Sequence, residues 1–265
     1  MTRFLVCPPD YFGIEYEINP WMRISNASDP QRSAQQWHAL MRQLEAVGAK
    51  LERMEPVKGL PDLVFTANAG FVANGIAVPS RFRHPERQRE EEHFTRWFIQ
   101  HGFRVITLDP TMYFEGAGDL LGFPDLWFGG YRQRSDIRAY TVLTDIFHQE
   151  ILPLELVDSH FYHLDTCFCP LSGGELLYYP PAFDNYAQTV INDRVPSHRR
   201  WTVPRAEAVR FACNAVCVDR HVVLPAGCPQ TMEWLTAHGY EPHPVELDEF
   251  MKAGGAAKCL TLALD

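Results

Sequence analysis

The order of apolar and amphipathic segments most constrains how this chain folds. Each of four apolar runs that predict strands is followed by an amphipathic run that predicts a helix. The copies share no sequence identity and recur at roughly 50-residue spacing, a pattern typical of radial or stacked architectures. We therefore expect an α/β fold in which a sheet module repeats around an axis; a doubly wound sheet stays open, since periodicity does not fix strand order. The strand runs are residues 62–79, 126–131, 175–180 and 221–225, and the helix runs are 86–101, 135–147, 185–192 and 231–238.

Two local signals add detail to this pattern. The dipeptide Asn74-Gly75 stands between apolar runs and predicts a β-hairpin. Asp29 followed by Pro30 is typical of a helix start, with an N-cap and a proline at the first helical position. A further helix is therefore expected there, with its apolar residues at helical spacing. These residues are Ala34, Trp37, Leu40, Met41 and Leu44.

Length and composition limit the classes of protein to which this chain can belong. The 265 residues are 46% hydrophobic and contain no linker-like stretch, so we expect a single domain over 1–265. The net charge is −9 without a basic run, which disfavours nucleic-acid binding. The N-terminus has no signal-like apolar region, and no run approaches the roughly 20 apolar residues of a membrane span. A cytoplasmic protein with reduced thiols is expected, since its seven cysteines are odd in number and irregularly spaced.

A glycine-rich segment near the C-terminus delivers one cysteine, Cys259, ahead of a final apolar run. Glycines let the backbone approach a ligand closely and leave room beside a thiol, which favours a reactive cysteine. The alternative is that Gly254 and Gly255 end a short helix and that Cys259 belongs to the core, where free cysteines are common. The local pattern does not separate the two.

A second cluster contains His163 and Asp165, which would point to the same face if this segment is a strand. An imidazole and a carboxylate would then share one pocket; the alternative is a histidine bonded only to a neighbour. Cys167 and Cys169 follow, but Cys213 and Cys217 do not complete a zinc-binding spacing. We expect no metal.

Two more clusters offer groups suited to a planar guanidinium. Glu115 and Asp119 flank a Gly-Ala-Gly step, and two carboxylates in a turn match the N–H donors of a guanidinium fork. Asp62 and Asn68 are an even number of residues apart and would share a strand face. Ordinary turns are the alternative for both.

Together the four clusters resemble the guanidino-group modifying superfamily, which includes arginine deiminases, dimethylarginine hydrolases and glycine amidinotransferases. The motifs CPPDY, INPWM, DLVFTANAG, SRF, FEGAGD, FYHLDTCFCPL, FACNAV and GGAAKCLTL are similar to those of its arginine dihydrolase group, over essentially all of the chain. The resemblance implies the pentein fold, an α/β propeller of about five ββαβ-like units.

The resemblance also implies roles for single residues. It makes Cys259 the nucleophile and His163 the acid–base residue, with Glu115 beside it, and places Asp119 and Asp165 at the guanidinium. Asn68 stands where deiminases usually have an acid. The residues implied to hold the rest of the substrate are Asn19, Phe65, Arg87 and Arg134, the two arginines suiting an α-carboxylate.

The implied activity is hydrolysis of L-arginine to ornithine, carbon dioxide and two ammonia through a Cys-thiouronium intermediate, without a cofactor. One alternative is an arginine deiminase or dimethylarginine hydrolase that stops at citrulline. Another is a non-catalytic protein that binds a cationic amino acid. Homo-oligomerisation is left open. Some dihydrolases continue into a domain resembling ornithine cyclodeaminase; this sequence ends six residues after Cys259, so conversion of ornithine to proline is not expected.

Overall fold

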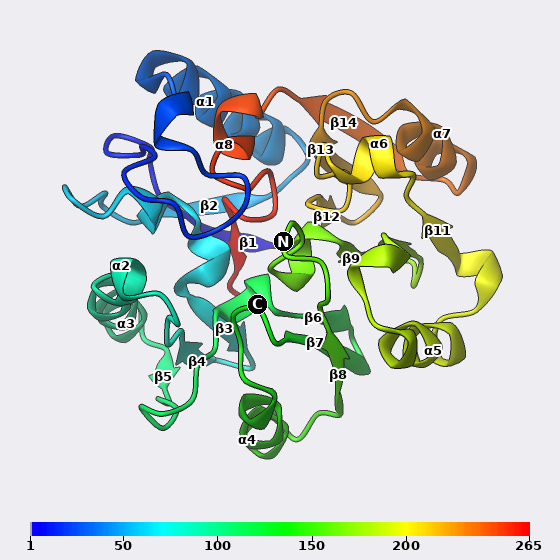
Figure 1. The fold of residues 1–265 in the computed structure, drawn as a ribbon, viewed down its shortest axis with the longest axis horizontal. Helices are drawn as coiled ribbons and strands as arrows, with labels where there is room; N and C mark the ends of the chain where they lie inside the picture. Colours follow the sequence, from blue (N-terminus) through cyan, green and yellow to red (C-terminus); the bar gives the residue numbers. More distant parts are fainter. Residues whose placement is uncertain (1) are drawn as a thin grey trace.

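Three-stranded sheets arranged around a central axis form the body of the molecule, and helices lie outside them (Figure 1). The computed structural model describes residues 2–265, and this part of the chain contains five such sheets. In four of them, two antiparallel strands form a hairpin, and the third strand returns parallel to the second after a helix; the fifth has the same strand directions, but its antiparallel strands come from the two ends of the described chain. The predicted sheet module is therefore confirmed as a ββαβ unit, and the strand orders exclude a doubly wound sheet.

Four units follow one another along the chain. Their sheets are β3 (Gly70–Ala73), β4 (Ile76–Pro79) and β5 (Arg104–Val105); β6 (Leu120–Phe123), β7 (Leu126–Tyr131) and β8 (Ile151–Glu155); β9 (Phe168–Pro170), β10 (Leu176–Tyr178) and β11 (Arg200–Thr202); and β12 (Val216–Val218), β13 (His221–Pro225) and β14 (Glu241–Val245). Their connecting helices are α3 (Glu91–Gln100), α4 (Ile137–Phe147), α5 (Asn185–Arg194) and α7 (Pro229–Ala237). Shorter helices are α2 (Pro85–Gln88), α6 (Arg205–Ala208) and α8 (Asp248–Met251).

Residues from both ends of the chain build the fifth sheet. Strand β15 (Leu262–Ala263) pairs antiparallel with β1 (Arg3–Val6), and β2 (Lys50–Arg53) pairs parallel with β1 after helix α1 (Pro30–Ala46). Arg3 also forms an ion pair with Asp265, with 3.0 Å between Nε and Oδ1. The ring is thus closed by strands far apart in sequence.

Seven 3₁₀ turns connect these elements in residues 2–265, and several of them lie at the inner ends of the sheets. They are η1 (Ile24–Asn26), η2 (Pro61–Val64), η3 (Thr66–Ala69), η4 (Gly116–Gly118), η5 (Leu164–Thr166), η6 (Pro180–Ala182) and η7 (Ser197–Arg199).

The strongest local signals predicted their elements correctly. Asp29 caps α1, since its side chain accepts a hydrogen bond from the backbone N–H of Arg32, and Pro30 is the first helical residue. Asn74 and Gly75 both have positive φ, as a tight hairpin between β3 and β4 requires. The helices predicted at 135–147, 185–192 and 231–238 are α4, α5 and α7, with ends shifted by a few residues.

Three predictions of local structure were wrong. Residues 62–69 form the turns η2 and η3 instead of a strand, so Asp62 and Asn68 do not share a strand face. His163 and Asp165 lie at and inside η5, not on a strand. The helix expected over 86–101 is divided into α2 and α3, because the N–H of Glu90 bonds the carbonyl of Arg87 and leaves the helical ladder.

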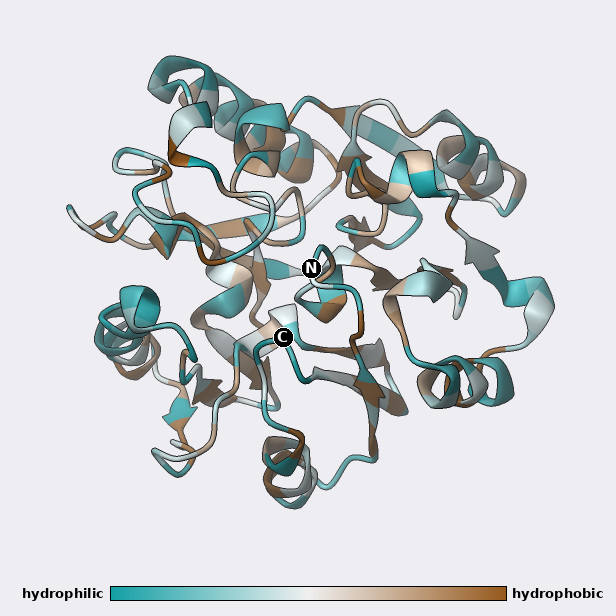
Figure 2. Ribbon diagram, in the orientation of Figure 1, coloured by the Kyte–Doolittle hydropathy of each residue, from teal (hydrophilic) through white to brown (hydrophobic). Residues whose placement is uncertain are grey.

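Apolar side chains fill the space between the helices and the sheets. Figure 2 shows hydrophilic residues on the outer faces of the helices and hydrophobic ones toward the sheets. In α3, for example, Phe94, Trp97 and Phe98 are buried. In residues 2–265, no helix combines the length and the apolar character needed to cross a bilayer.

Candidate active site

The turn just ahead of the first strand of each sheet carries a polar side chain or a thiol. The turns η3, η4 and η5 precede β3, β6 and β9, and irregular turns precede β12 and β15. Because the units repeat around an axis, equivalent turns meet near it, and η4 contacts both η3 and η5. The side chains in these turns are Asn68, Asp119, Asp165, Asn214 and Cys259.

A small enclosed cavity lies among these turns. Its volume of about 10 Å³ is barely enough for one water, so an amino acid could enter only if the wall moved. Part of the wall comes from the segment between β1 and α1, where the indole N–H of Trp21 donates to the carbonyl of His160 at 2.7 Å. The lining residues are Ile18, Asn19, Met22, Asp62, Phe65, Asn68, Arg87, Arg134, Tyr162, His163, Ala253, Gly255 and Cys259.

The Cys259 thiol lies at this cavity between two polar partners. Its Sγ donates to Asp165 Oδ2 at 3.3 Å and accepts from Asn214 Nδ2 at 3.1 Å. The Asn214 carbonyl oxygen accepts from the backbone N–H groups of Ala256 and Cys259. One buried carboxamide therefore fixes both the thiol and the turn that carries it.

Burial sets the resting protonation of this pair. Burial, reinforced by the Asp165 charge, raises the pKa of the Cys259 thiol well above its usual value. Burial also raises the pKa of Asp165 to about 6, and Lys258 and the bonds from Cys259 and Asn214 oppose the increase. Asp165 Oδ1 is buried without a hydrogen-bond partner in residues 2–265. A cation with N–H donors would satisfy this oxygen and favour the thiolate.

His163 belongs to a second charged group. Its Nε2 lies 2.7 Å from Glu115 Oε2, and Arg134 Nη1 donates to the same oxygen at 2.9 Å. Burial alone would raise the pKa of Glu115, but Arg134 and the bond with His163 hold it well below the usual range. Glu115 is therefore ionised and fixes the imidazole; it lies behind the cavity wall and does not line it.

Asp119 also lies outside the cavity wall. Its Oδ2 accepts from Ser135 Oγ at 2.6 Å, and its Oδ1 accepts from the N–H of Leu164 at 3.0 Å. Burial raises its pKa to about 6. With both oxygens bonded within the protein, Asp119 holds the turn after His163. Asp119 does not line the cavity in this structure, and its expected contact with a guanidinium stays a prediction.

Arg87 lines the cavity, but most of its N–H groups are bonded to the protein. Its Nε and Nη2 donate to the two oxygens of Glu90 at 2.9 and 2.7 Å, and its Nη1 donates to Asn68 Oδ1 at 2.9 Å. Asn68 Nδ2 in turn donates to the carbonyl of Glu115 at 3.1 Å. Arg87 thus orients the Asn68 amide. Arg134 forms fewer hydrogen bonds within the protein than Arg87 does.

Asn19 and Phe65 both lie at the cavity. Asn19 Nδ2 donates to the carbonyl of Ala253, and its Oδ1 accepts from the N–H groups of Trp21 and Met22, so the residue also forms the turn around Pro20. A Cβ on Gly255 would lie 2.8 Å from Phe65 Cε1 and 3.1 Å from Cys259 Cβ. The glycine therefore leaves the room beside the thiol that the sequence predicted.

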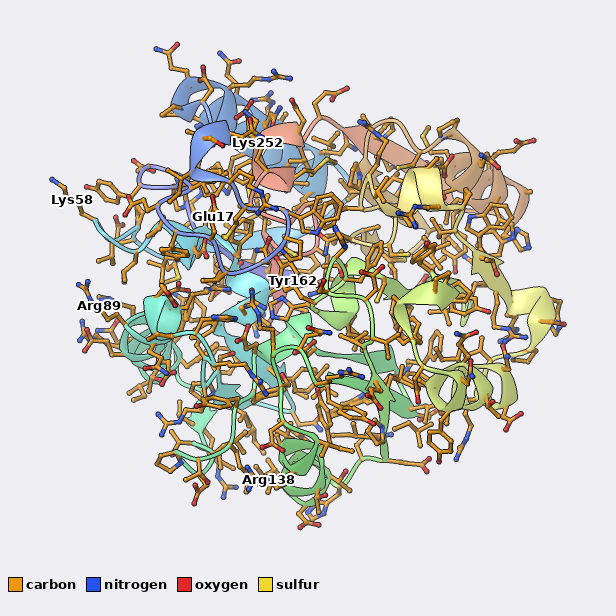
Figure 3. The ribbon with its side chains drawn as sticks, viewed as in Figure 1. Glu17, Lys58, Arg89, Arg138, Tyr162 and Lys252 are labelled. Atoms are coloured by element: carbon orange, nitrogen blue, oxygen red, sulfur yellow. The ribbon has the colours of Figure 1, made fainter. Side chains whose placement is uncertain are left out.

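Two residues of the site were missed by sequence reasoning. Asn214 is within FACNAV and in the turn position equivalent to Cys259, a signal that only the repeat reveals. Tyr162 lines the cavity, with its ring 4.6 Å from the Arg134 guanidinium carbon. Figure 3 shows Tyr162 near the centre of the ring, whereas Lys58, Arg89 and Arg138 are at its rim.

Comparison with known proteins places this geometry in a family. No protein-family model matches the chain. The bifunctional arginine dihydrolase/ornithine cyclodeaminase ArgZ of Synechocystis sp. is 46% identical over 98% of this chain, which spans only 37% of that protein. The N(G),N(G)-dimethylarginine dimethylaminohydrolase of Mycobacterium tuberculosis is 39% identical, covering 99% of this chain and 85% of that protein.

Solved structures agree with this placement. The N-terminal domain of ArgZ, covalently bound to a reaction intermediate, matches with a TM-score of 0.97 and 44% identity, covering 100% of this chain and 98% of that one. The expected pentein-type α/β propeller is confirmed by this match and by the five sheets of residues 2–265. The chain therefore belongs to the guanidino-group modifying superfamily, which holds both the arginine dihydrolases and the dimethylarginine dimethylaminohydrolases.

Proposed function

We propose that this chain hydrolyses the guanidinium group of L-arginine and yields ornithine, carbon dioxide and two molecules of ammonia. One observation carries the proposal: a buried thiol at the cavity is bonded to Asp165, whose other carboxylate oxygen has no partner in residues 2–265, and the cavity also holds a histidine fixed by an ionised glutamate. A guanidinium would complete this set of groups. The similarity to ArgZ, an arginine dihydrolase, supports the choice of reaction.

Substrate binding is the step that activates the nucleophile. His163 Nε2 is bonded to Glu115, whereas the Cys259 thiol is bonded to Asp165 and Asn214. Either a bound guanidinium or protonated His163 could serve as the cation that stabilises the thiolate, and this arrangement favours the guanidinium. Entry of the guanidinium compensates the Asp165 charge and lowers the free-energy cost of forming the thiolate in a low-dielectric pocket.

The first half of the reaction ends at citrulline. The Cys259 thiol loses its proton to His163, the thiolate attacks the guanidinium carbon, His163 returns that proton to the departing ammonia, and a thiouronium remains on Cys259. Water deprotonated by His163 then attacks the thiouronium carbon and breaks its bond to sulfur. Glu115 serves as a positioning residue, because its carboxylate holds the imidazole through the 2.7 Å contact with Nε2.

The second half requires a site that keeps a neutral ureido group. Cys259 attacks the ureido carbon, a second ammonia leaves, and hydrolysis of the thiocarbamate gives ornithine and carbon dioxide. Asn68 is the residue we hold responsible, because an amide both donates and accepts whereas a carboxylate only accepts. The Asn68 carbonyl already accepts from Arg87, so its N–H groups are directed to acceptors.

The proposal is tested by incubating the purified protein with L-arginine and following ornithine, citrulline and ammonia. Two ammonia per ornithine are expected, with all products lost in Cys259→Ser. Cys217→Ser is the matched control, because Cys217 is a partly exposed thiol outside the cavity, and it should retain activity. Citrulline with one ammonia would instead identify a deiminase.

A second candidate is hydrolysis of N(G),N(G)-dimethylarginine, which the mycobacterial relative favours by its name. Assays with the methylated substrate, read out as dimethylamine and citrulline, distinguish it from the dihydrolase. Binding of arginine to Cys259 without release of any product would point to a binding protein.

A further inference from the structure

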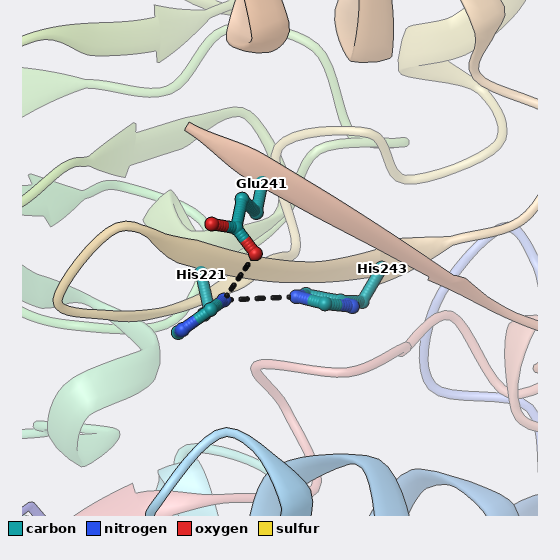
Figure 4. A group of neighbouring side chains, drawn as sticks. All are labelled: His221, Glu241 and His243. Carbon is teal, nitrogen blue, oxygen red and sulfur yellow. Dashed lines mark hydrogen bonds and ion pairs between the residues drawn. The ribbon is translucent and has the colours of Figure 1, made fainter. Parts of the chain in front are cut away.

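Two histidines and a glutamate meet on the fourth sheet, outside the cavity already described. His221 begins β13 and lies opposite Glu241 in the parallel register with β14, while His243 is two residues further along β14. Residues two apart on a strand share a face, so the register alone brings the three side chains together (Figure 4). None of them lines the cavity that holds Cys259.

The distances among their polar atoms fit a shared ion. His221 Nδ1 lies 3.1 Å from His243 Nε2 and 3.3 Å from Glu241 Oε2, and the three potential ligand atoms are all within 4.8 Å of one another. Zinc bonds nitrogen and carboxylate oxygen at about 2.0–2.2 Å, so two ligands of a tetrahedral ion lie roughly 3.3 Å apart. Both measured separations are close to that edge length.

The environment leaves these groups available for coordination. The His221 side chain is 33% exposed and that of Glu241 is 69% exposed, so an ion reaches them from solvent. Paired imidazoles with a carboxylate match the donor preference of zinc and its neighbours among the divalent transition metals.

We propose that His221, Glu241 and His243 form a binding site for a divalent transition-metal ion of the zinc type. Three protein ligands leave a fourth position for water. The ion joins β13 to β14 at the end of the sheet where both strands begin. Since it binds only where the two strands are paired, it stabilises the folded fourth unit by mass action.

The test uses Co²⁺ as a spectroscopic probe for the full chain. Cys259→Ser is the parent protein, because the reactive thiol would otherwise offer a competing site. Titration with Co²⁺ should give the visible absorption of a tetrahedral complex at one ion per chain, reversed by Zn²⁺. Adding His221→Ala or His243→Ala should lower the affinity by more than about tenfold, since loss of even an outer-shell partner costs 10–100-fold.

A matched control and a thermal measurement complete the design. His198→Ala removes an exposed histidine on another unit and should leave the titration unchanged. Zn²⁺ should raise the melting temperature of the parent but not of the His243→Ala variant. With a chelator present, the His221→Ala and His243→Ala variants should melt close to the temperature of the parent without metal. A Co²⁺ affinity in His221→Ala and His243→Ala equal to that of the parent would overturn the site, as would strong thiolate-to-cobalt absorption, which would place the ion on a cysteine.

Discussion

Asn68 and Asn214 occupy equivalent turns in two units but hold different partners. Asn68 lies between Arg87 and the carbonyl of Glu115, and Asn214 lies between the Cys259 turn and Asp165. Each uses both the donor and the acceptor of its amide, so an aspartate of the same size is a sharp probe of each.

Asn68→Asp should shift the product from ornithine toward citrulline. The carboxylate keeps the bond from Arg87 but loses the donor to the Glu115 carbonyl, and it repels the oxygen of a ureido group. The measurement is the ratio of citrulline to ornithine at complete consumption of arginine. Asn185→Asp, on an exposed helix start, is the control. An unchanged ornithine yield in Asn68→Asp would contradict the role given to this amide.

Asn214 variants should separate positioning of the thiol from stability. Asn214→Asp keeps the acceptor for the N–H groups of Ala256 and Cys259 but sets a charge against Sγ, so alkylation of Cys259 by iodoacetamide should move to higher pH. Asn214→Ala leaves these two N–H groups without their acceptor and should lower the free energy of unfolding by about 1–3 kcal/mol. If the alkylation profile of the Asp variant matches that of the parent, Asn214 does not act on the thiol.

The Asp165 charge should make arginine binding depend on pH. Its pKa is raised to about 6, so the carboxyl takes up a proton as the pH falls through that value and loses the charge that we propose attracts the guanidinium. The dissociation constant of arginine from the Cys259→Ser protein, measured by calorimetry, should therefore increase below about pH 6. In Asp165→Asn, arginine binding should be weak and its dissociation constant nearly independent of pH. A steep pH dependence in this variant would assign the change in arginine affinity to another group.

At the scale of elements, the turn before β15 controls where the thiol lies. Gly255→Ala puts a methyl group 2.8 Å from Phe65 Cε1 and 3.1 Å from Cys259 Cβ, so the turn must shift. A misplaced nucleophile costs on the order of 10²-fold in rate. Gly13→Ala is the matched control because nothing lies within 4 Å of its Cβ position. Equal turnover numbers for the two variants would show that the turn adapts.

Sequence predicted the elements whose signals are local. The cap at Asp29, the positive φ of Asn74 and the helical spacing of α1 each depend on neighbouring residues, and the structure has all three. The repeat of strands followed by a helix could be predicted for the same reason, since it depends on local apolar patterning, whereas the ββαβ unit was implied only by the family resemblance.

The turns of the site could not be predicted in this way, because distant contacts fix them. Thr66 Oγ1 donates to the carbonyl of Leu5, and the N–H of Ala67 bonds the carbonyl of Cys259. The apolar run at 62–69 favours a strand locally, and these contacts hold it as two 3₁₀ turns. The role of Asn214 was hidden likewise, because its partners are 45 and 49 residues away.

At the scale of the whole molecule, the fifth sheet holds the ring closed. Leu262 in β15 is 1% exposed and packs between sheets, so Leu262→Ala should lower the free energy of unfolding by about 2–5 kcal/mol. Ile24→Ala, at a side chain that is 57% exposed, should change it by less than about 0.5 kcal/mol. Urea titrations followed by tryptophan fluorescence measure the free energy of unfolding of both variants. Similar losses of stability in the two would show that closure of the ring adds little to the stability of the fold.

The pairing of β15 with β1 also sets an order of events during translation. The segment that closes the ring leaves the ribosome after the other four units, and Cys259 stands three residues ahead of β15 in that same segment. A nascent chain therefore has neither a closed ring nor the proposed nucleophile until this segment emerges. A chain interrupted before that point is left with β1 as an open sheet edge.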